Sequence, residues 1–179
     1  RPRGEGNLAS GDLQTQSITG QPVVSGRATR VVTRNRVDWT SQSGWYLPLA
    51  FNDNQIGERV AGNILLRGNR VVFNTGYLSN TSVADPCEGR SGDGWLMALD
   101  ILNGSMLPYS VLDTNGDGVV NDADVLSAGL DLDVGLPGDI TVLRGDGTEH
   151  YLIDGSAGTE TLTGLSFSLF RRIMWRQLM

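Results

Sequence analysis

The sequence predicts an all-β fold, and three observations support this prediction. Glycine is abundant, at 24 of 179 residues, and proline is scarce, at six. Apolar residues make up only 39% of the chain and fall in short runs. Short β-prone runs separated by tight turns are typical of sheets rather than of helical bundles. A chain of this length fits one domain, or one large piece of a domain.

The N-terminal part begins without regular pattern and then becomes strand-like. Residues 1–12 have no apolar periodicity, and we expect a loose leader there before a β-domain over 13–179. Two short strands are expected over 21–25 and 29–33, with a turn at Ser25-Gly26.

Two β-hairpins and one buried strand follow along the chain. The turns contain Gly68-Asn69 in the first hairpin and Gly145 to Gly147 in the second. The run 94–100 is almost continuously apolar, which indicates a strand buried on both faces. The predicted hairpin strands are 59–66 with 70–75, and 140–143 with 149–153; one or two terminal strands are expected over 165–178.

The acidic loop from Asp113 to Asp124 carries the clearest chemical signal. Oxygen-bearing side chains stand at positions 1, 3, 5, 9 and 12 of this twelve-residue loop, and a glycine stands at position 6, as in the EF-hand pattern. Calcium takes six to eight hard oxygen ligands, and a glycine with positive φ allows alternating oxygens to curl around one point. The predicted calcium ligands are Asp113, Asn115, Asp117, the carbonyl of Val119, Asn121 (directly or through water) and Asp124, with Gly118 at the turn.

The surroundings of the loop differ from those of an EF-hand. The segment 106–112 contains Pro108 and is expected to be extended, whereas one or two helical turns are expected over 122–128. Asp124 replaces the usual glutamate and reaches less far, which predicts an affinity of about 10⁻⁵ M or weaker, as in extracellular modules. The pattern leaves open whether the calcium is structural or regulatory.

Charge and hydropathy exclude several classes of function. The net charge is −6, with a balance of +4 over residues 1–70 and −10 over residues 71–179. The acidic second part disfavours a nucleic-acid partner and suits a hard cation. No apolar run approaches ~18 residues, so no membrane span is expected. Cys87 is the single cysteine, either a free thiol or the partner of a cysteine outside this chain.

Weaker motifs have ordinary explanations. Arg144-Gly145-Asp146 spells an adhesion tripeptide at a hairpin tip, but Asp-Gly is also a good turn sequence. His150 has no nucleophile in a motif beside it, so we expect no enzyme activity. Two further charged groups are interpreted mainly as solvated faces. They are Arg30 with Arg34 and Arg36, and Asp131 with Asp133 and Asp139, the latter a weaker candidate for a second cation site.

From Trp39 onward, several segments carry a resemblance to a known family. These segments are Val37-Asp38-Trp39 with Gly44 to Leu47, Gly57 to Val60 with Leu65-Leu66, Arg70 to Phe73, Asp85-Pro86-Cys87, Gly94 to Asp100, and Arg171 to Leu178. In this order they resemble the C-terminal part of PilY-type adhesins, the tip-associated proteins of type IV pili. The acidic loop follows at the place that the resemblance leads us to expect.

The resemblance implies a modified β-propeller of quinoprotein-like type, of which this chain would form the last blades and the C-terminal tail. It also implies one calcium site on the loop, where Asn121 departs from the aspartate that is frequent in the family. The implied role is pilus biogenesis and surface attachment at an extracellular pilus tip. The implied partners are the remainder of the adhesin, minor pilins and a host surface receptor. A dockerin-like calcium-dependent binding module is the alternative, although dockerins carry the loop twice within a helical domain.

Overall fold

The computed structural model describes residues 9–52, 56–78, 92–145 and 147–167. These residues form short and long strands and one 3-10 turn, η1 (Ser10–Asp12), which confirms the predicted all-β class. Within the described part of the chain, no helix has the length and hydrophobicity needed to cross a bilayer. The strands are β1 (Gln14–Thr15), β2 (Ile18–Gly20), β3 (Val23–Val24), β4 (Arg27–Val32), β5 (Trp45–Tyr46), β6 (Arg59–Arg67), β7 (Arg70–Leu78), β8 (Gly92–Asp100), β9 (Gly129–Leu132), β10 (Pro137–Arg144), β11 (Thr148–Gly155) and β12 (Gly158–Leu165).

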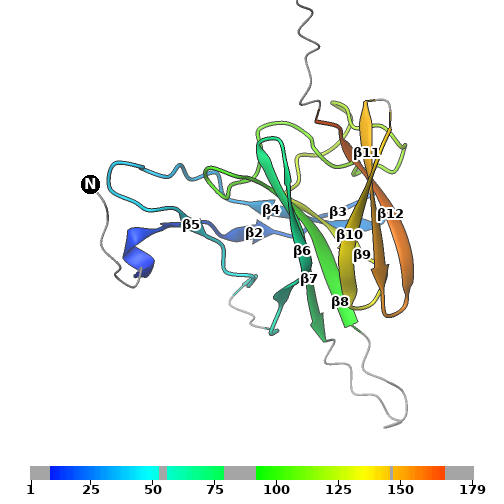
Figure 1. Cartoon of the computed structure of the whole chain (residues 1–179), viewed down its shortest axis with the longest axis horizontal. Coiled ribbons are helices and arrows are strands. Elements are labelled where there is room, and N and C mark those ends of the chain that lie inside the picture. The colour runs from blue at the N-terminus through cyan, green and yellow to red at the C-terminus, as the bar shows by residue number, and fades with distance from the viewer. Residues whose placement is uncertain (1–8, 53–55, 79–91, 146, 168–179) are drawn as a thin grey trace, which may run out of the picture.

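The strands form one large antiparallel sheet, one three-stranded sheet and a short parallel pair (Figure 1). The large sheet has the order β2-β4-β9-β8-β7-β6, and β3 pairs with β4 at its margin. The second sheet has the order β10-β11-β12, while β1 pairs with β5. Strands β2 and β5 lie toward one end of the molecule and β10 to β12 at the other, whereas β3 and the start of β4 lie close to β12.

Both predicted hairpins are confirmed. Strands β6 and β7 pair up to Arg67 and Arg70, so that Gly68 and Asn69 form the two-residue loop between them. Strands β10 and β11 are the second hairpin. The expected turn at Ser25-Gly26 is also present, and both residues have positive φ, at 51° and 85°.

The large sheet is apolar on both faces, because it packs between two layers. Along β8, Leu96 and Ala98 point into the core that the large sheet shares with β10 to β12. Their neighbours Trp95, Met97 and Leu99 point into a second core, covered by the N-terminal segments. All five side chains are at most 4% exposed. The prediction of a strand buried on both faces is therefore confirmed, since successive side chains alternate across a sheet.

A bulge in β6 joins the two sheets. The register shifts between Ala61 and Ile64, and the Asn63 side chain then pairs with the backbone of Ile140. Its Oδ1 accepts from the Ile140 N–H at 2.8 Å, and its Nδ2 donates to the Ile140 carbonyl at 3.2 Å. Gly62 has φ of +68°, and a Cβ there would lie 2.5 Å from the Gly138 carbonyl oxygen. Only glycine fits this crossing point.

The expectation that Arg30 belongs to a solvated face is wrong. Its side chain is 2% exposed and forms a two-pronged ion pair with the buried carboxylate of Glu58, at 2.6 and 2.7 Å. The guanidinium also stacks on Trp95, 4.0 Å from the ring centroid. A buried charge requires a partner, and here the partner comes from a segment 28 residues further along the chain.

The helical turns expected over residues 122–128 are absent. The chain makes a single turn at Asp124 and then joins the large sheet, where the Ala128 N–H donates to the Arg30 carbonyl at 2.7 Å. The Ala128 carbonyl in turn accepts from the Ala98 N–H at 2.8 Å. The backbone groups that would form helical hydrogen bonds therefore form sheet hydrogen bonds instead. The strand at Gly158–Leu165 was not predicted, and most of the expected terminal strand region, 168–179, lies outside the described residues.

Candidate metal site: the loop from Asp113 to Asp124

The acidic loop begins at a firm point of the fold. Leu112 and Val111 are buried to 1% exposure, and Leu112 forms an isolated bridge to Gly164 of β12. The Asp113 N–H then donates to the Thr163 carbonyl at 3.0 Å. Within the described residues no α-helix flanks the loop, so it is a lone loop and not a helix–loop–helix unit, as the sequence predicts.

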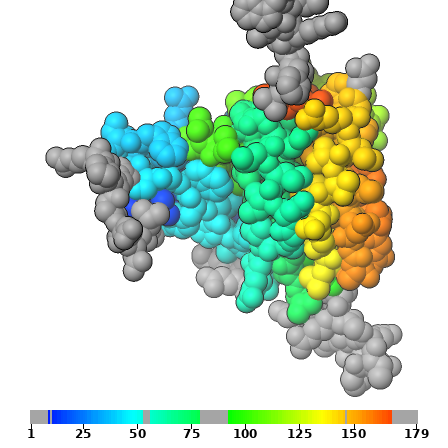
Figure 2. All heavy atoms as spheres, in the orientation of Figure 1, coloured from blue at the N-terminus to red at the C-terminus, as the bar shows by residue number. Residues whose placement is uncertain are grey.

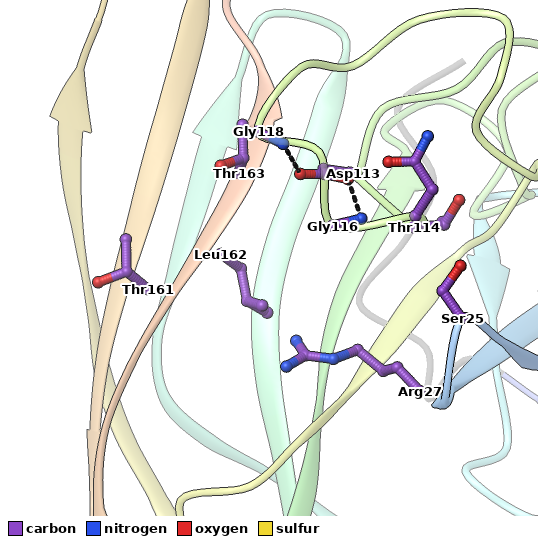
Figure 3. Close-up of a pocket in the computed structure, with 10 residues that line it drawn as sticks. Ser25, Arg27, Asp113, Thr114, Gly116, Gly118, Thr161, Leu162 and Thr163 are labelled. Carbon is purple, nitrogen blue, oxygen red and sulfur yellow. Dashed lines mark hydrogen bonds between the residues drawn. The ribbon is translucent and has the colours of Figure 1, made fainter.

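Asp113 organises the first half of the loop. Its Oδ1 accepts from the Gly116 N–H at 2.6 Å, and its Oδ2 accepts from the Gly118 N–H at 2.8 Å (Figure 3). Gly118 has φ of +84° in open space, so backbone conformation, and not lack of room, requires glycine there. The predicted sharp turn at position 6 of the loop is therefore present.

Three other predicted ligands each cap a local turn. The Oδ1 atoms of Asn115, Asp117 and Asn121 accept from the N–H two residues further on, at 2.9, 2.9 and 2.7 Å. Each of these side-chain oxygens keeps a lone pair, since an amide or carboxylate oxygen accepts more than one bond. The successive turns bend the backbone around its own oxygens, which is the shape that an oxygen-coordinated ion requires.

Asp124 is placed differently from the other predicted ligands. It is 6% exposed, whereas Asp117 and Asn121 are exposed. Its Oδ1 accepts from the Thr114 N–H at 2.7 Å, from the Thr114 hydroxyl at 3.2 Å and from the Asn115 N–H at 3.3 Å. Its Oδ2 accepts from the Asn121 N–H at 2.9 Å. Direct binding of an ion by Asp124 remains a prediction.

The donor set of the loop suits calcium better than a softer metal. Its potential ligands are carboxylate, amide and carbonyl oxygens only, and hard divalent cations prefer oxygen. Within the described residues, no three His, Cys, Asp or Glu side chains gather as a metal-binding group, so the site depends on amide and backbone oxygens as well. The residues present therefore fit a calcium ion, although with few charged ligands.

A polar cavity of about 350 Å³ adjoins the loop. It lies between Asp113 to Gly118, the Ser25 turn before β4, and residues 161–163 of β12, as Figure 3 shows. Arg27 is the cation in its lining and is ion-paired with Glu160. The cavity opens one side of the loop to solvent.

The second acidic group is only partly brought together. Asp131 and Asp133 line another polar cavity together with Asp93, a residue that the sequence did not single out. Asp139 is placed elsewhere, where its Oδ1 accepts from the Asn63 N–H at 2.8 Å. Burial, and next the nearby Asp93 charge, raise the pKa of Asp131 to about 6.

The structure describes the adhesion tripeptide only in part, and it describes His150 fully. Arg144 and Gly145 are exposed at the end of the second hairpin, but Asp146 lies outside the described residues, as does Cys87. His150 is partly buried in β11, with its Nδ1 at 3.3 Å from the Thr163 hydroxyl. That neighbour is a strand residue of the adjacent β12, which is consistent with a structural role.

The described residues define an all-β protein in which one loop with the EF-hand sequence pattern lies outside any helix pair. Sequence comparison finds the type IV pilus biogenesis factor PilY1 of Pseudomonas aeruginosa, strains PAO1 and PAK, 30% identical over 124 residues. That match covers 64% of this chain and 10% of each relative. The PilY1 homolog of Xylella fastidiosa is 35% identical over 104 residues, which is 48% of this chain and 7% of the relative.

The structural comparison agrees with the sequence comparison. The crystal structure of the Pseudomonas aeruginosa PilY1 C-terminal domain matches with a TM-score of 0.69 and 25% identity. The match covers 88% of this chain and 32% of the chain in that crystal structure. No family model matches the chain. The chain is homologous, in sequence and in fold, to the C-terminal region of PilY1, and it spans about a tenth of the length of the Pseudomonas relatives.

Proposed function

We propose that this chain is the calcium-binding C-terminal domain of a type IV pilus tip adhesin that acts in pilus biogenesis and surface attachment. Its homology to PilY1, a type IV pilus biogenesis factor, supports the pilus role. The observation that carries the calcium role is the conformation of the loop, in which Gly118 turns at positive φ and donates its N–H to Asp113. No catalytic role is proposed.

The calcium ligands would come from the first nine residues of the loop, with Asp124 at its closing end. The side chains of Asp113, Asn115, Asp117 and Asn121 and the carbonyl of Val119 supply oxygens at alternating positions. Calcium would neutralise the carboxylates and hold the segment after β8 against β12, to which the loop is already bonded at Asp113. Loss of the ion should therefore loosen the C-terminal strands.

The proposed fold is the last part of a modified β-propeller. Strands β6 to β9 are consecutive neighbours in an antiparallel meander, and a propeller blade is a four-stranded antiparallel sheet. Strand β6 also has apolar residues on its outer face. Val60, Ile64 and Leu66 are 47%, 59% and 64% exposed, and β6 lies at the open surface in Figure 2. An exposed apolar sheet face fits a position next to further blades.

The proposed setting is extracellular, at the pilus tip or the bacterial surface. The proposed partners are the remainder of the adhesin, minor pilins and a host surface receptor, with no nucleic acid. These proposals follow from the homology to a pilus protein and from the acidic composition after residue 70. The dockerin-like alternative gains no support, because the described residues hold the loop once and contain no α-helix beside it.

Calcium titration of the 179-residue protein tests the proposal. We expect one bound ion, with a Kd of about 10⁻⁵ M or weaker. At a hundredfold excess over that Kd, calcium would stabilise the fold by about 2.7 kcal/mol, which raises Tm by about 5–10 °C over the value in EDTA.

The control is Asp117→Ala, which removes one exposed ligand. Its Tm should be the same with calcium and with EDTA. A wild-type protein that binds no ion at millimolar calcium would contradict the calcium proposal.

A further inference from the structure

An apolar groove of about 190 Å³ lies along β6, on the face of the large sheet that belongs to the second core. Segment 45–49 lines it on one side, and Val60 and Ile64 of β6 line it on the other. The buried side chains of Val71 and Phe73 in β7 complete the lining. All of these side chains are apolar, and Val60 and Ile64 are exposed. A groove of this kind, with an open apolar rim, is typical of a docking surface.

The apolar rim continues to the turn between β6 and β7. Leu66 is 64% exposed and lies two positions before Gly68. The described chain ends at the same turn, because Phe167 packs so closely on Gly68 that a Cβ there would overlap its ring. Arg70 of β7 holds this end in place by donating to the Leu165 carbonyl at 2.5 Å. Residues 168–179 therefore begin beside one end of the apolar rim, as Figure 1 indicates for the end of β12.

The composition of residues 168–179 matches the groove. Other ranges outside the described residues are mostly polar, since residues 1–8 contain one apolar side chain, residues 53–55 none and residues 79–91 three of thirteen. Seven of the twelve residues in 168–179 are apolar, namely Leu169, Phe170, Ile173, Met174, Trp175, Leu178 and Met179.

The length of this segment is also sufficient. From Gly68 back to Val60 the strand measures about 26 Å, at the rise of about 3.3 Å per residue. Twelve extended residues span up to about 40 Å. A segment that begins at the turn can therefore follow β6 over the whole groove.

We propose that residues 168–179 run back along β6 and dock in this groove, with their apolar side chains against Val60, Ile64 and Leu66. This inference goes beyond the proposed function and does not depend on calcium binding. Each large apolar side chain that leaves water favours the docked state by about tenfold or more. Any further propeller blade would then pack on residues 168–179 and not directly on β6.

Photo-crosslinking of the 179-residue protein tests the position of the segment. The photoreactive residue p-benzoylphenylalanine replaces Leu66, and mass spectrometry of the digested protein identifies the cross-linked peptides. We expect cross-links to residues 168–179 of the same chain. The matched control is the same replacement at Val23 of β3, which is 68% exposed and should give no such cross-link. Cross-links from Leu66 only to other parts of the chain, or to a second copy, would overturn the proposal.

Limited trypsin digestion tests the docking contact itself, because residues 168–179 contain three arginines. Ile64→Asp places a charge in the groove and should raise the rate of cleavage after these arginines by about tenfold or more. Val23→Asp is the control and should leave this rate at the wild-type value. If Ile64→Asp does not fold, Leu66→Ser takes its place, since Leu66 is exposed. A cleavage rate equal to that of the wild-type protein in the folded variant would overturn the proposal.

Discussion

Removing the charge of Glu58 should be among the most destabilising single changes in this protein. The carboxylate is 1% exposed and makes both of its hydrogen bonds to the Arg30 guanidinium, which is itself 2% exposed. Glu58→Gln keeps the shape but leaves the buried Arg30 charge without compensation. Breaking a buried ion pair on one side costs about 3–5 kcal/mol. For a domain of this size, that loss lowers Tm by roughly 6–20 °C.

Urea denaturation followed by tryptophan fluorescence measures the effect, because the Arg30 guanidinium stacks directly on buried Trp95. The matched control is Glu160→Gln, whose partner Arg27 is 33% exposed, so that the expected loss is below about 1 kcal/mol. The double variant Arg30→Met with Glu58→Met should recover most of the stability, since an apolar pair replaces a buried ion pair well. Equal losses in Glu58→Gln and Glu160→Gln would refute the reasoning.

Two further predictions concern the junction of the sheets and the second acidic cavity. Asn63→Ala should cost about 2–5 kcal/mol, because it leaves the N–H and carbonyl of buried Ile140 without partners. Urea unfolding measures this loss, and a change below about 0.5 kcal/mol would contradict the bridging role. Asp131 has a pKa near 6 in the fold against 3.8 for an unperturbed aspartate, so the stability it contributes is complete below pH 3.8 and is lost as pH rises through 6. Asp131→Asn should therefore raise the free energy of unfolding relative to wild type at pH 8, by about 1–2 kcal/mol after solvent screening, and not at pH 4. Urea unfolding at the two pH values measures this, and an equal gain at both would contradict the assignment.

The acidic loop from Asp113 to Asp124 shows how much of a candidate site the local sequence predicts. The order of oxygens and the glycine at position 6 predicted the loop, its sharp turn and its extended approach, and the backbone follows that prediction at Gly118. These features depend on residues within six positions of one another. The partner of Asp124 was not predicted, because the pairing joins it to Thr114 and Asn115 across the loop, and several other donors were equally close in sequence.

The sequence by itself determined the all-β class, the two hairpins, the doubly buried strand β8 and the position of the loop, because alternation and turn chemistry act between near neighbours. Only the tertiary structure decided which polar residues go inside. Arg30 is buried because it pairs with Glu58 and stacks on Trp95 in the interior. The Asn63 side chain bonds to the Ile140 backbone, as a neighbouring strand would, because the two sheets cross at that point. Such contacts join residues from 28 to 77 positions apart, and their energies depend on a burial that no local pattern encodes.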